Sequence, residues 1–210
     1  MRVVDFAKDT RNAQFIIFAN DALKRLTELE TDLGKKDQYF RHLIKMVINC
    51  DHRSLPELGK DAAGTTSFIR KRSEDLLTDN ILLYSDFLLQ QKLYQEVLFL
   101  VQEGLVIAKR NDRRLPRVSS LYDLAGWACW NLGKVDEAID WARKAKVHSN
   151  RFFNLKEDQF LYHLGLYLQK AGIDAAEAKE SLEHALKITR NDTLKQDIVS
   201  KLKELDPAYA

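Results

Sequence analysis

Apolar residues recur at three- and four-residue spacing along almost the whole chain, and no segment keeps the strict alternation of a half-buried strand. Only eight glycines and three prolines interrupt the 210 residues, so good helix formers dominate. The sequence therefore predicts an all-α fold. Breaks in the apolar pattern place helices near residues 3–30, 36–50, 55–76, 80–91, 93–109, 118–132, 135–148, 155–171, 174–189 and 192–205.

Short connections join helices in the second half of the chain. The breaks near Lys92, at Gly133-Lys134 and at Gly172-Ile173 leave only a few residues between helices, which forces antiparallel hairpins. Three predicted helix starts carry a capping signal, a polar side chain followed three residues later by glutamate. These pairs are Ser54 with Glu57, Asn154 with Glu157, and Asp174 with Glu177.

Composition limits the class of protein. The 33 basic and 31 acidic side chains leave a formal charge of +2, which does not indicate a nucleic-acid or membrane-surface partner. The most apolar early run, residues 15–19, is much shorter than the roughly 20 residues of a bilayer span. The first residues show no export signal, and Cys50 and Cys129 make no disulfide framework. We expect a cytoplasmic protein with no membrane partner.

An internal repeat becomes visible when the hairpins are aligned on their turns. The clearest copy reads LAGWACWNLG over residues 124–133, with small residues at Gly126, Ala138 and Ala145 where helices must approach closely. This pattern resembles the tetratricopeptide repeat (TPR) at nearly every defining position, with Tyr122 in place of the first aromatic residue of the family.

Two further copies are less regular. One reads LYHLG over residues 161–165 and continues with the small residues Gly172, Ala178 and Ala185. The other begins at Tyr84 and has Ser85 in place of the usual glycine and Val97 in place of the usual alanine. The copies are spaced 41 and 40 residues apart, longer than the roughly 34 residues typical of the family, and the extra length falls in loops.

The resemblance implies antiparallel helical hairpins stacked as a right-handed TPR-like solenoid with a C-terminal capping helix. It divides the chain into divergent N-terminal helices over residues 1–78, TPR-like repeats over 79–189, and a capping helix and tail over 190–210. One interpretation of residues 36–76 is an irregular repeat. The apolar run at 15–19 suggests burial against more than one surface, with a homodimer contact and a docking site for an upstream domain as alternatives.

Signals for catalysis or cofactor binding are weak. Residues 59–66 have the spacing of a phosphate loop but place Thr65 where the essential lysine would stand. The five histidines are scattered, and His163 is interpreted as a structural or surface residue. We therefore expect no enzyme activity, no cofactor and no metal. Basic residues near 69–72 and 109–117 are mixed with acidic ones and lack aromatic residues, so we expect solvated loops and no direct nucleic-acid binding.

In the TPR family the first helix of each hairpin lines a concave face, and the resemblance assigns particular residues to it. An extended peptide would suit this mixed surface, because aromatic rings grip apolar groups and amides pair with a peptide main chain. The alternative for Trp127 and Trp130 is core packing, whereas Trp141 on the second helix is expected to pack. The predicted peptide-binding residues are Asp86, Gln90, Asp123, Trp127, Trp130, Asn131, Gln159 and Tyr162.

The resemblance also bears on the class of partner. Chaperone-binding TPR domains hold a carboxylate with lysine and asparagine, but the matching positions here include Asp86 and Asp123, which would repel a carboxylate. We therefore expect a non-enzymatic module that binds a protein or short peptide, with a positively charged or N-terminal group better received. The alternative is a sensor domain of a bacterial peptide-responsive transcriptional regulator, in which case this chain would be a fragment or would act through protein contacts.

Overall fold

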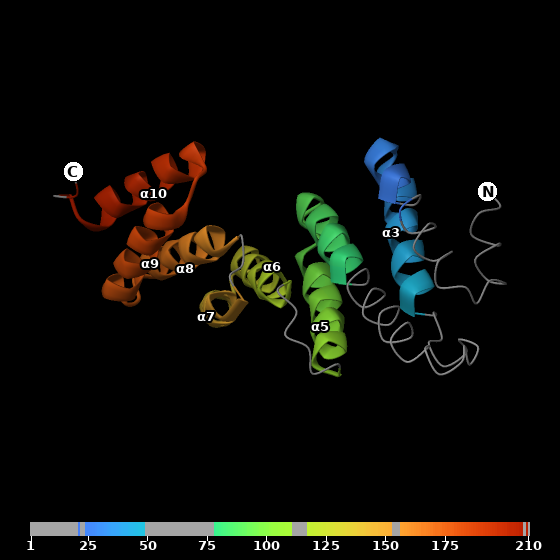
Figure 1. Cartoon of the computed structure of the whole chain (residues 1–210), viewed down its shortest axis with the longest axis horizontal. Coiled ribbons are helices and arrows are strands. Elements are labelled where there is room, and N and C mark those ends of the chain that lie inside the picture. Colours follow the sequence, from blue (N-terminus) through green and yellow to red (C-terminus); the bar gives the residue numbers. More distant parts are fainter. Residues whose placement is uncertain are drawn as a thin grey trace, which may run out of the picture. The chain divides into compact units, whose positions relative to one another are not determined.

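The computed structural model describes residue 21 and residues 24–48, 78–110, 117–152, 156–207 and 209. It divides into two compact units, Met1–Tyr84 and Ser85–Ala210. All regular secondary structure in these described segments is helical, which confirms the all-α prediction (Figure 1). The labelled helices of these segments are α3 (Leu33–Ile48), α5 (Tyr94–Arg110), α6 (Val118–Asn131), α7 (Val135–Phe152), α8 (Glu157–Ala171), α9 (Ala175–Ile188) and α10 (Asp192–Leu205). Residues 24–29 and 78–90 are also helical.

In the first unit, α3 packs against the start of the helix over residues 78–90. The rings of Phe40 and Tyr84 stack with centroids 5.3 Å apart, and both residues are buried. The Tyr84 hydroxyl donates a 2.6 Å hydrogen bond to Asp37, whose carboxylate also pairs with Arg41 at 2.8 Å. The hydrogen bonds from Arg41 and Tyr84 outweigh the effect of burial and lower the pKa of Asp37. The predicted helix at 55–76, the cap at Ser54, the apolar run at 15–19 and the phosphate-loop-like segment lie outside the described residues.

Three turns with the same geometry close the hairpins of the second unit. Lys92, Gly133 and Gly172 each have a positive φ, at 59°, 75° and 67°. In each turn the N–H of the following residue bonds the carbonyl oxygen five residues back, the pattern that ends a helix with a left-handed residue. Glycine adopts this conformation without a Cβ clash, so Gly133 and Gly172 are the residues that the turn favours. The third copy of the repeat uses Lys92 at the equivalent place.

Consecutive helices from α5 to α10 pack against one another along this unit, as the order of colours in Figure 1 shows. In addition, α6 contacts α8 and α8 contacts α10, so the first helices of successive hairpins touch. This arrangement confirms stacked helical hairpins of the solenoid type. The apolar faces of α8, α9 and α10 share one core cluster, which α10 closes as a capping helix. The buried members of this cluster are Leu161, Leu182, Ala185, Ile198 and Leu202.

Small residues bring the two helices of a hairpin close together. A Cβ placed on Gly126 of α6 would lie 3.3 Å from the carbonyl oxygen of Ala138 on α7. A Cβ on Gly165 of α8 would lie only 2.6 Å from Cγ of Leu182 and 3.1 Å from the carbonyl oxygen of Ala178 on α9. Both glycines therefore stand where backbone and side chains of the partner helix leave little room, as the repeat pattern predicts.

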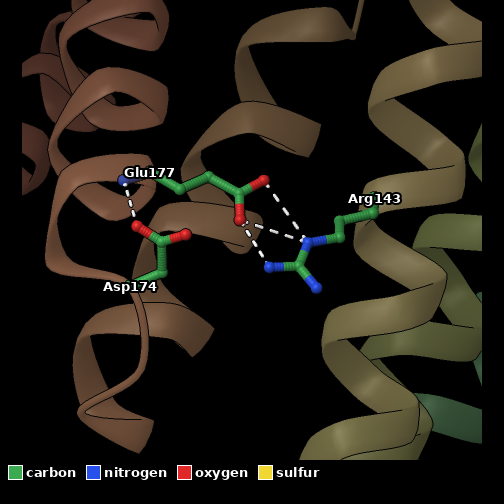
Figure 2. A network of polar contacts seen from close by, with 3 residues as sticks. All are labelled: Arg143, Asp174 and Glu177. Carbon is green, nitrogen blue, oxygen red and sulfur yellow. Dashed lines mark hydrogen bonds and ion pairs between the residues drawn. The ribbon is translucent and has the colours of Figure 1, made fainter.

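A polar network links the second helices of neighbouring hairpins. Arg143 on α7 pairs with Glu177 on α9 through Nε at 3.1 Å and through a second guanidinium nitrogen (Figure 2). The side chain of Asp174 accepts a 2.9 Å hydrogen bond from the backbone N–H of Glu177, so it caps α9 (Figure 2). The predicted cap at Asp174 is therefore confirmed, and the same glutamate ties the start of α9 to α7.

Other helix ends differ from the sequence prediction by a few residues. Helix α8 begins at Glu157, after Lys156 without a side-chain cap, rather than at 155; the predicted capping residue Asn154 lies outside the described residues. Helix α7 continues to Phe152 instead of ending at 148. Helix α3 begins at Leu33 rather than 36, because the Asp32 carboxylate accepts hydrogen bonds from the N–H groups of Gly34 and Lys35.

Candidate functional site

Side chains of α6 and α8 meet where the first helices of two successive hairpins touch. We call this surface the α6–α8 face and define it by Asp123, Trp127 and Trp130 on α6 and by Tyr162, His163 and Tyr167 on α8. Glycines let each of these helices lie close to its own hairpin partner, and the turns at Gly133 and Gly172 set the hairpins in register. The stacking therefore brings together residues about forty positions apart in the sequence.

An acidic side chain and an imidazole form the polar centre of this face. Nδ1 of His163 lies 2.7 Å from Oδ1 of Asp123, and 22% and 15% of the two side chains are exposed. Burial of the imidazole opposes its protonation, but the charge of Asp123 and its hydrogen bond outweigh burial and raise the pKa of His163 above the ordinary value of 6.5. The sequence interpretation of His163 as structural or surface did not include this partner.

Aromatic rings surround the polar pair. The Trp127 ring lies 5.2 Å from the His163 ring, and the Trp130 ring stacks on Tyr167 with centroids 4.8 Å apart. Tyr167 is fully buried, and its hydroxyl makes no hydrogen bond within the described residues. Burial, with the nearby charge of Asp123, raises the pKa of Tyr167 far above its usual range. The face is thus a packed aromatic cluster rather than two isolated tryptophans.

Three ring nitrogens on this face have no hydrogen-bond partner among the described residues. Nε1 of Trp127, Nε1 of Trp130 and Nε2 of His163 make no hydrogen bond within the part of the chain that the structure describes. Unlike the Tyr167 hydroxyl, none of them is a fully buried polar atom without a partner, so none of the three nitrogens is completely enclosed. Partly buried rings with open polar edges can hold apolar groups and hydrogen-bond a ligand at the same time.

The remaining predicted residues of α6 and its neighbours are mostly exposed. Asn131 is exposed, and its Nδ2 donates a 2.8 Å hydrogen bond to the carbonyl oxygen of Trp127 one turn earlier. Asp86 is exposed as a residue, yet protein around its carboxylate excludes some water and raises its pKa, with Lys156 opposing and Asp123 adding to the rise. Gln90 is also exposed. Asp86 and Asp123 are therefore close enough to share one electrostatic environment.

The two predicted residues of α8 differ in burial. Gln159 is exposed, and its backbone N–H bonds the side chain of the preceding residue. Tyr162 is partly buried and packs against the core cluster that α10 closes, although its ring also lies 5.8 Å from His163. Desolvation, together with acidic groups of α10, raises the pKa of Tyr162. The structure thus places Tyr162 between the α6–α8 face and the capping helix.

Trp141 of α7 lies apart from these contacts. Its ring stacks on Tyr122 with centroids 5.7 Å apart, and Nζ of Lys144 lies 4.1 Å from its centroid. Packing by Trp141 agrees with the expectation for the second helix of a hairpin. Cys129 is a buried residue of α6; burial and the nearby Glu137 raise the pKa of this thiol to about 11.

The Asp123–His163 pair invites comparison with a catalytic triad. Nε2 of His163 faces no hydroxyl or thiol group within hydrogen-bond distance in the described segments, so the nucleophile of such a triad is not present there. The same segments contain no group of three side chains suited to hold a metal ion. They also contain no helix with the length and apolar character of a bilayer span.

Comparisons with known proteins agree with the repeat pattern. Residues 119–146 match the family model of the tetratricopeptide repeat. No curated protein matches the sequence of this chain. Among solved structures, BtubC (BKLC) from P. vanneervenii superposes with a TM-score of 0.69 at 15% identity, covering 97% of this chain and 79% of that one.

Two other solved structures share the fold. The kinesin light chain TPR-like repeats of a Podosopora anserina structure give a TM-score of 0.57 at 14% identity, covering 93% of this chain and 87% of that one. A Signal Transduction ATPase with Numerous Domains (STAND) from Pyrococcus horikoshii, which has a tetratricopeptide repeat sensor, gives 0.56 at 15% identity, covering 97% and 32%. Helical hairpins, a repeat-family match over α6 and α7, and TPR-like structural neighbours converge on one fold.

Proposed function

We propose that this tetratricopeptide-repeat chain is a non-enzymatic protein-interaction module that binds an extended peptide or partner segment along the α6–α8 face. TPR folds are typically interaction scaffolds, which supports the class of function. The observation that carries the proposal is the set of three open ring nitrogens, on Trp127, Trp130 and His163, among packed aromatic rings. An extended peptide has the complementary chemistry, because it offers a main-chain carbonyl at every residue and side chains that can pack on the rings.

Charge supports one preference within this class. Asp86 is an exposed residue with a partly desolvated carboxylate, and Asp123 contributes negative charge that its pairing with His163 compensates only when the imidazole is protonated. A ligand that carries a basic side chain or a free amino group beside Asp86 would be attracted, whereas a terminal carboxylate would be repelled. Asn131, Gln90 and Gln159 add exposed amides around the face that can pair with both the N–H and C=O of a peptide.

The direct test is selection of short peptides with acetylated amino ends and amidated carboxyl ends against the full chain. The affinity of the tightest binder is then measured by fluorescence anisotropy for the wild type and for Trp127→Phe, with Trp141→Phe as the matched control. We expect the first variant to weaken binding about fivefold to tenfold, from one lost hydrogen bond, and the control to bind as the wild type does. Equal affinity of all three proteins would contradict the proposed site.

A second candidate function is a sensor domain of a peptide-responsive bacterial transcriptional regulator. The structural likeness to a STAND protein with a tetratricopeptide repeat sensor supports it at the level of the fold. In this case a bound peptide shifts an arrangement of domains or subunits, because it binds one arrangement more tightly than the other. Small-angle scattering with and without the selected peptide separates the candidates: a changed particle size favours the sensor, and an unchanged one favours the simple binding module.

A further inference from the structure

His163 stands out because the sequence pattern assigned no binding role to it. We propose that His163 contacts the bound peptide directly, with its Nε2–H donating a hydrogen bond to a main-chain carbonyl oxygen, and that Asp123 is a positioning residue that acts through this imidazole. The inference rests on the proposed function and deepens it, because it names the contact and the chemical group of the ligand. It also changes the role of Asp123, which the sequence pattern treated as a direct contact.

The geometry of the imidazole carries the proposal. Asp123 holds Nδ1 at 2.7 Å, and the rings of Trp127 and Tyr167 pack beside the imidazole at 5.2 and 6.1 Å. These contacts fix the ring plane, so Nε2 on the other side of the ring takes a fixed direction. Nε2 has no partner in the described residues and is not completely enclosed, because 22% of the side chain is exposed and Nε2 is not one of the fully buried polar atoms without a partner. A fixed donor with an open edge is the arrangement that recognition requires.

Protonation decides whether Nε2 donates or accepts. In the neutral ring, Asp123 keeps the proton on Nδ1, so Nε2 can only accept; in the imidazolium both nitrogens donate. The carboxylate of Asp123 raises the pKa of His163, which extends the donating form to higher pH. Charged groups on the other packed helices act on residues other than His163. Arg143 of α7 pairs with Glu177 of α9. The charged groups of α10 that act on Tyr162 are Asp197, Lys201 and Glu204.

The surrounding charge selects a carbonyl over a carboxylate as the acceptor. Asp123 offsets the charge of the protonated imidazole, so a carboxylate on Nε2 would meet an ion pair with little net charge rather than an isolated cation, and it would still lose its own hydration. A peptide carbonyl carries no net charge and does not incur this cost. Apolar parts of the same peptide would then lie on Trp127 and Trp130.

Two substitutions of His163 separate recognition from packing. The amide nitrogen of Asn reaches about as far as Nδ1, so His163→Asn can keep the bond to Asp123 and loses the donor at Nε2. The amide nitrogen of Gln reaches about as far as Nε2, so His163→Gln can keep that donor and loses the bond to Asp123. We expect Asn to weaken binding of the selected capped peptide about tenfold or more, as for a hydrogen bond to a charged donor, and Gln to weaken it less.

A pH series tests the positioning role of Asp123. The tightest capped peptide without ionisable side chains serves as the probe, so that the charge of the peptide stays constant. We expect its affinity for the wild type to fall as pH rises through the pKa of His163. In Asp123→Asn this fall should move to lower pH, because the amide no longer stabilises the imidazolium. A residue that only supported packing would change the affinity without moving the midpoint of the pH series.

Different results would overturn the proposed peptide-binding function and the role given to His163. If no capped peptide binds the wild type, the proposed function fails and this inference fails with it. If a peptide binds and His163→Asn binds it as the wild type does, the inference is overturned while the proposed function stands. Thermal unfolding of both His163 variants checks that each remains folded, and an unmoved pH midpoint in Asp123→Asn would overturn the role given to Asp123.

Discussion

The close approach of α8 and α9 makes Gly165 sensitive to the addition of a single methyl group. A Cβ at this position lies 2.6 Å from Cγ of Leu182 and 3.1 Å from a backbone oxygen, and Leu182 is fully buried. Ordinary contact would require Leu182 to move by roughly 0.8 Å into neighbouring core side chains, and such overpacking costs about 1–3 kcal/mol. Alanine returns about 1 kcal/mol through its higher helix propensity. We therefore expect Gly165→Ala to lower the free energy of unfolding by up to about 2 kcal/mol.

Gly126 supplies the matched control, because it occupies the same position in the preceding hairpin. Its Cβ would lie 3.3 Å from a carbonyl oxygen and 3.6 Å from the next atoms, so only a small shift is needed. The gain in helix propensity then leaves Gly126→Ala neutral or slightly more stable than the wild type. Urea denaturation followed by circular dichroism measures both variants by linear extrapolation.

A double variant checks the cause. Leu182→Ala alone should cost about 2–5 kcal/mol by leaving a cavity. In combination with Gly165→Ala the added methyl group enters that cavity, so the pair should be less destabilised than the sum of the single variants. Equal stability of Gly165→Ala and Gly126→Ala, or strict additivity with Leu182→Ala, would refute the packing argument.

Three further predictions concern charge and the thiol. Because the folded-state pKa of His163 is raised, its pairing with Asp123 adds stability that is fully present below the ordinary pKa of 6.5 and is lost as pH rises through the folded-state value. The free energies of unfolding of the wild type and Asp123→Asn, measured by urea titration, should therefore converge at high pH. A difference that stays constant with pH would argue against the pair. Arg143→Ala should cost only about 1 kcal/mol in the same assay, since 43% of the side chain is exposed; no loss would mean that its ion pair contributes nothing. Cys129, in a Cys50→Ser background, should react with iodoacetamide much more slowly than free cysteine at pH 8, because its pKa is about 11; a rapid reaction would show an open thiol.

Most of the fold could be predicted from local patterns. Apolar spacing located the helices of residues 78–205, and the turns at Gly133 and Gly172 marked the hairpins because their backbone has a positive φ. The equivalent turn at Lys92 was found only by its place between helices, since lysine does not signal a left-handed conformation. The start of α3 was predicted three residues too late, because apolar spacing does not reveal a cap and Asp32 caps the helix through the N–H groups of Gly34 and Lys35.

The candidate site could be predicted only in part, for a reason that lies in the stacking. Repeat position singled out Asp123, Trp127 and Trp130 as residues of one helix, and they do lie together with residues of α8. Their partners His163 and Tyr167 belong to the next hairpin, so contact depends on how the two hairpins stack. The sequence does place two rings, His163 and Tyr167, two residues before and after Gly165. Their contacts with α6 can be identified only once the preceding hairpin is placed against α8. Whether these residues bind a peptide stays a prediction.

The three tryptophans of this chain allow the most direct test of the account. The full protein is labelled with 5-fluorotryptophan, and its three fluorine resonances are assigned by single Trp→Phe substitutions. Titration with the selected capped peptide should shift the resonances of Trp127 and Trp130 and leave that of Trp141 in place. A shift confined to Trp141, or saturating binding that moves none of the three, would contradict the claim that the α6–α8 face is the recognition surface.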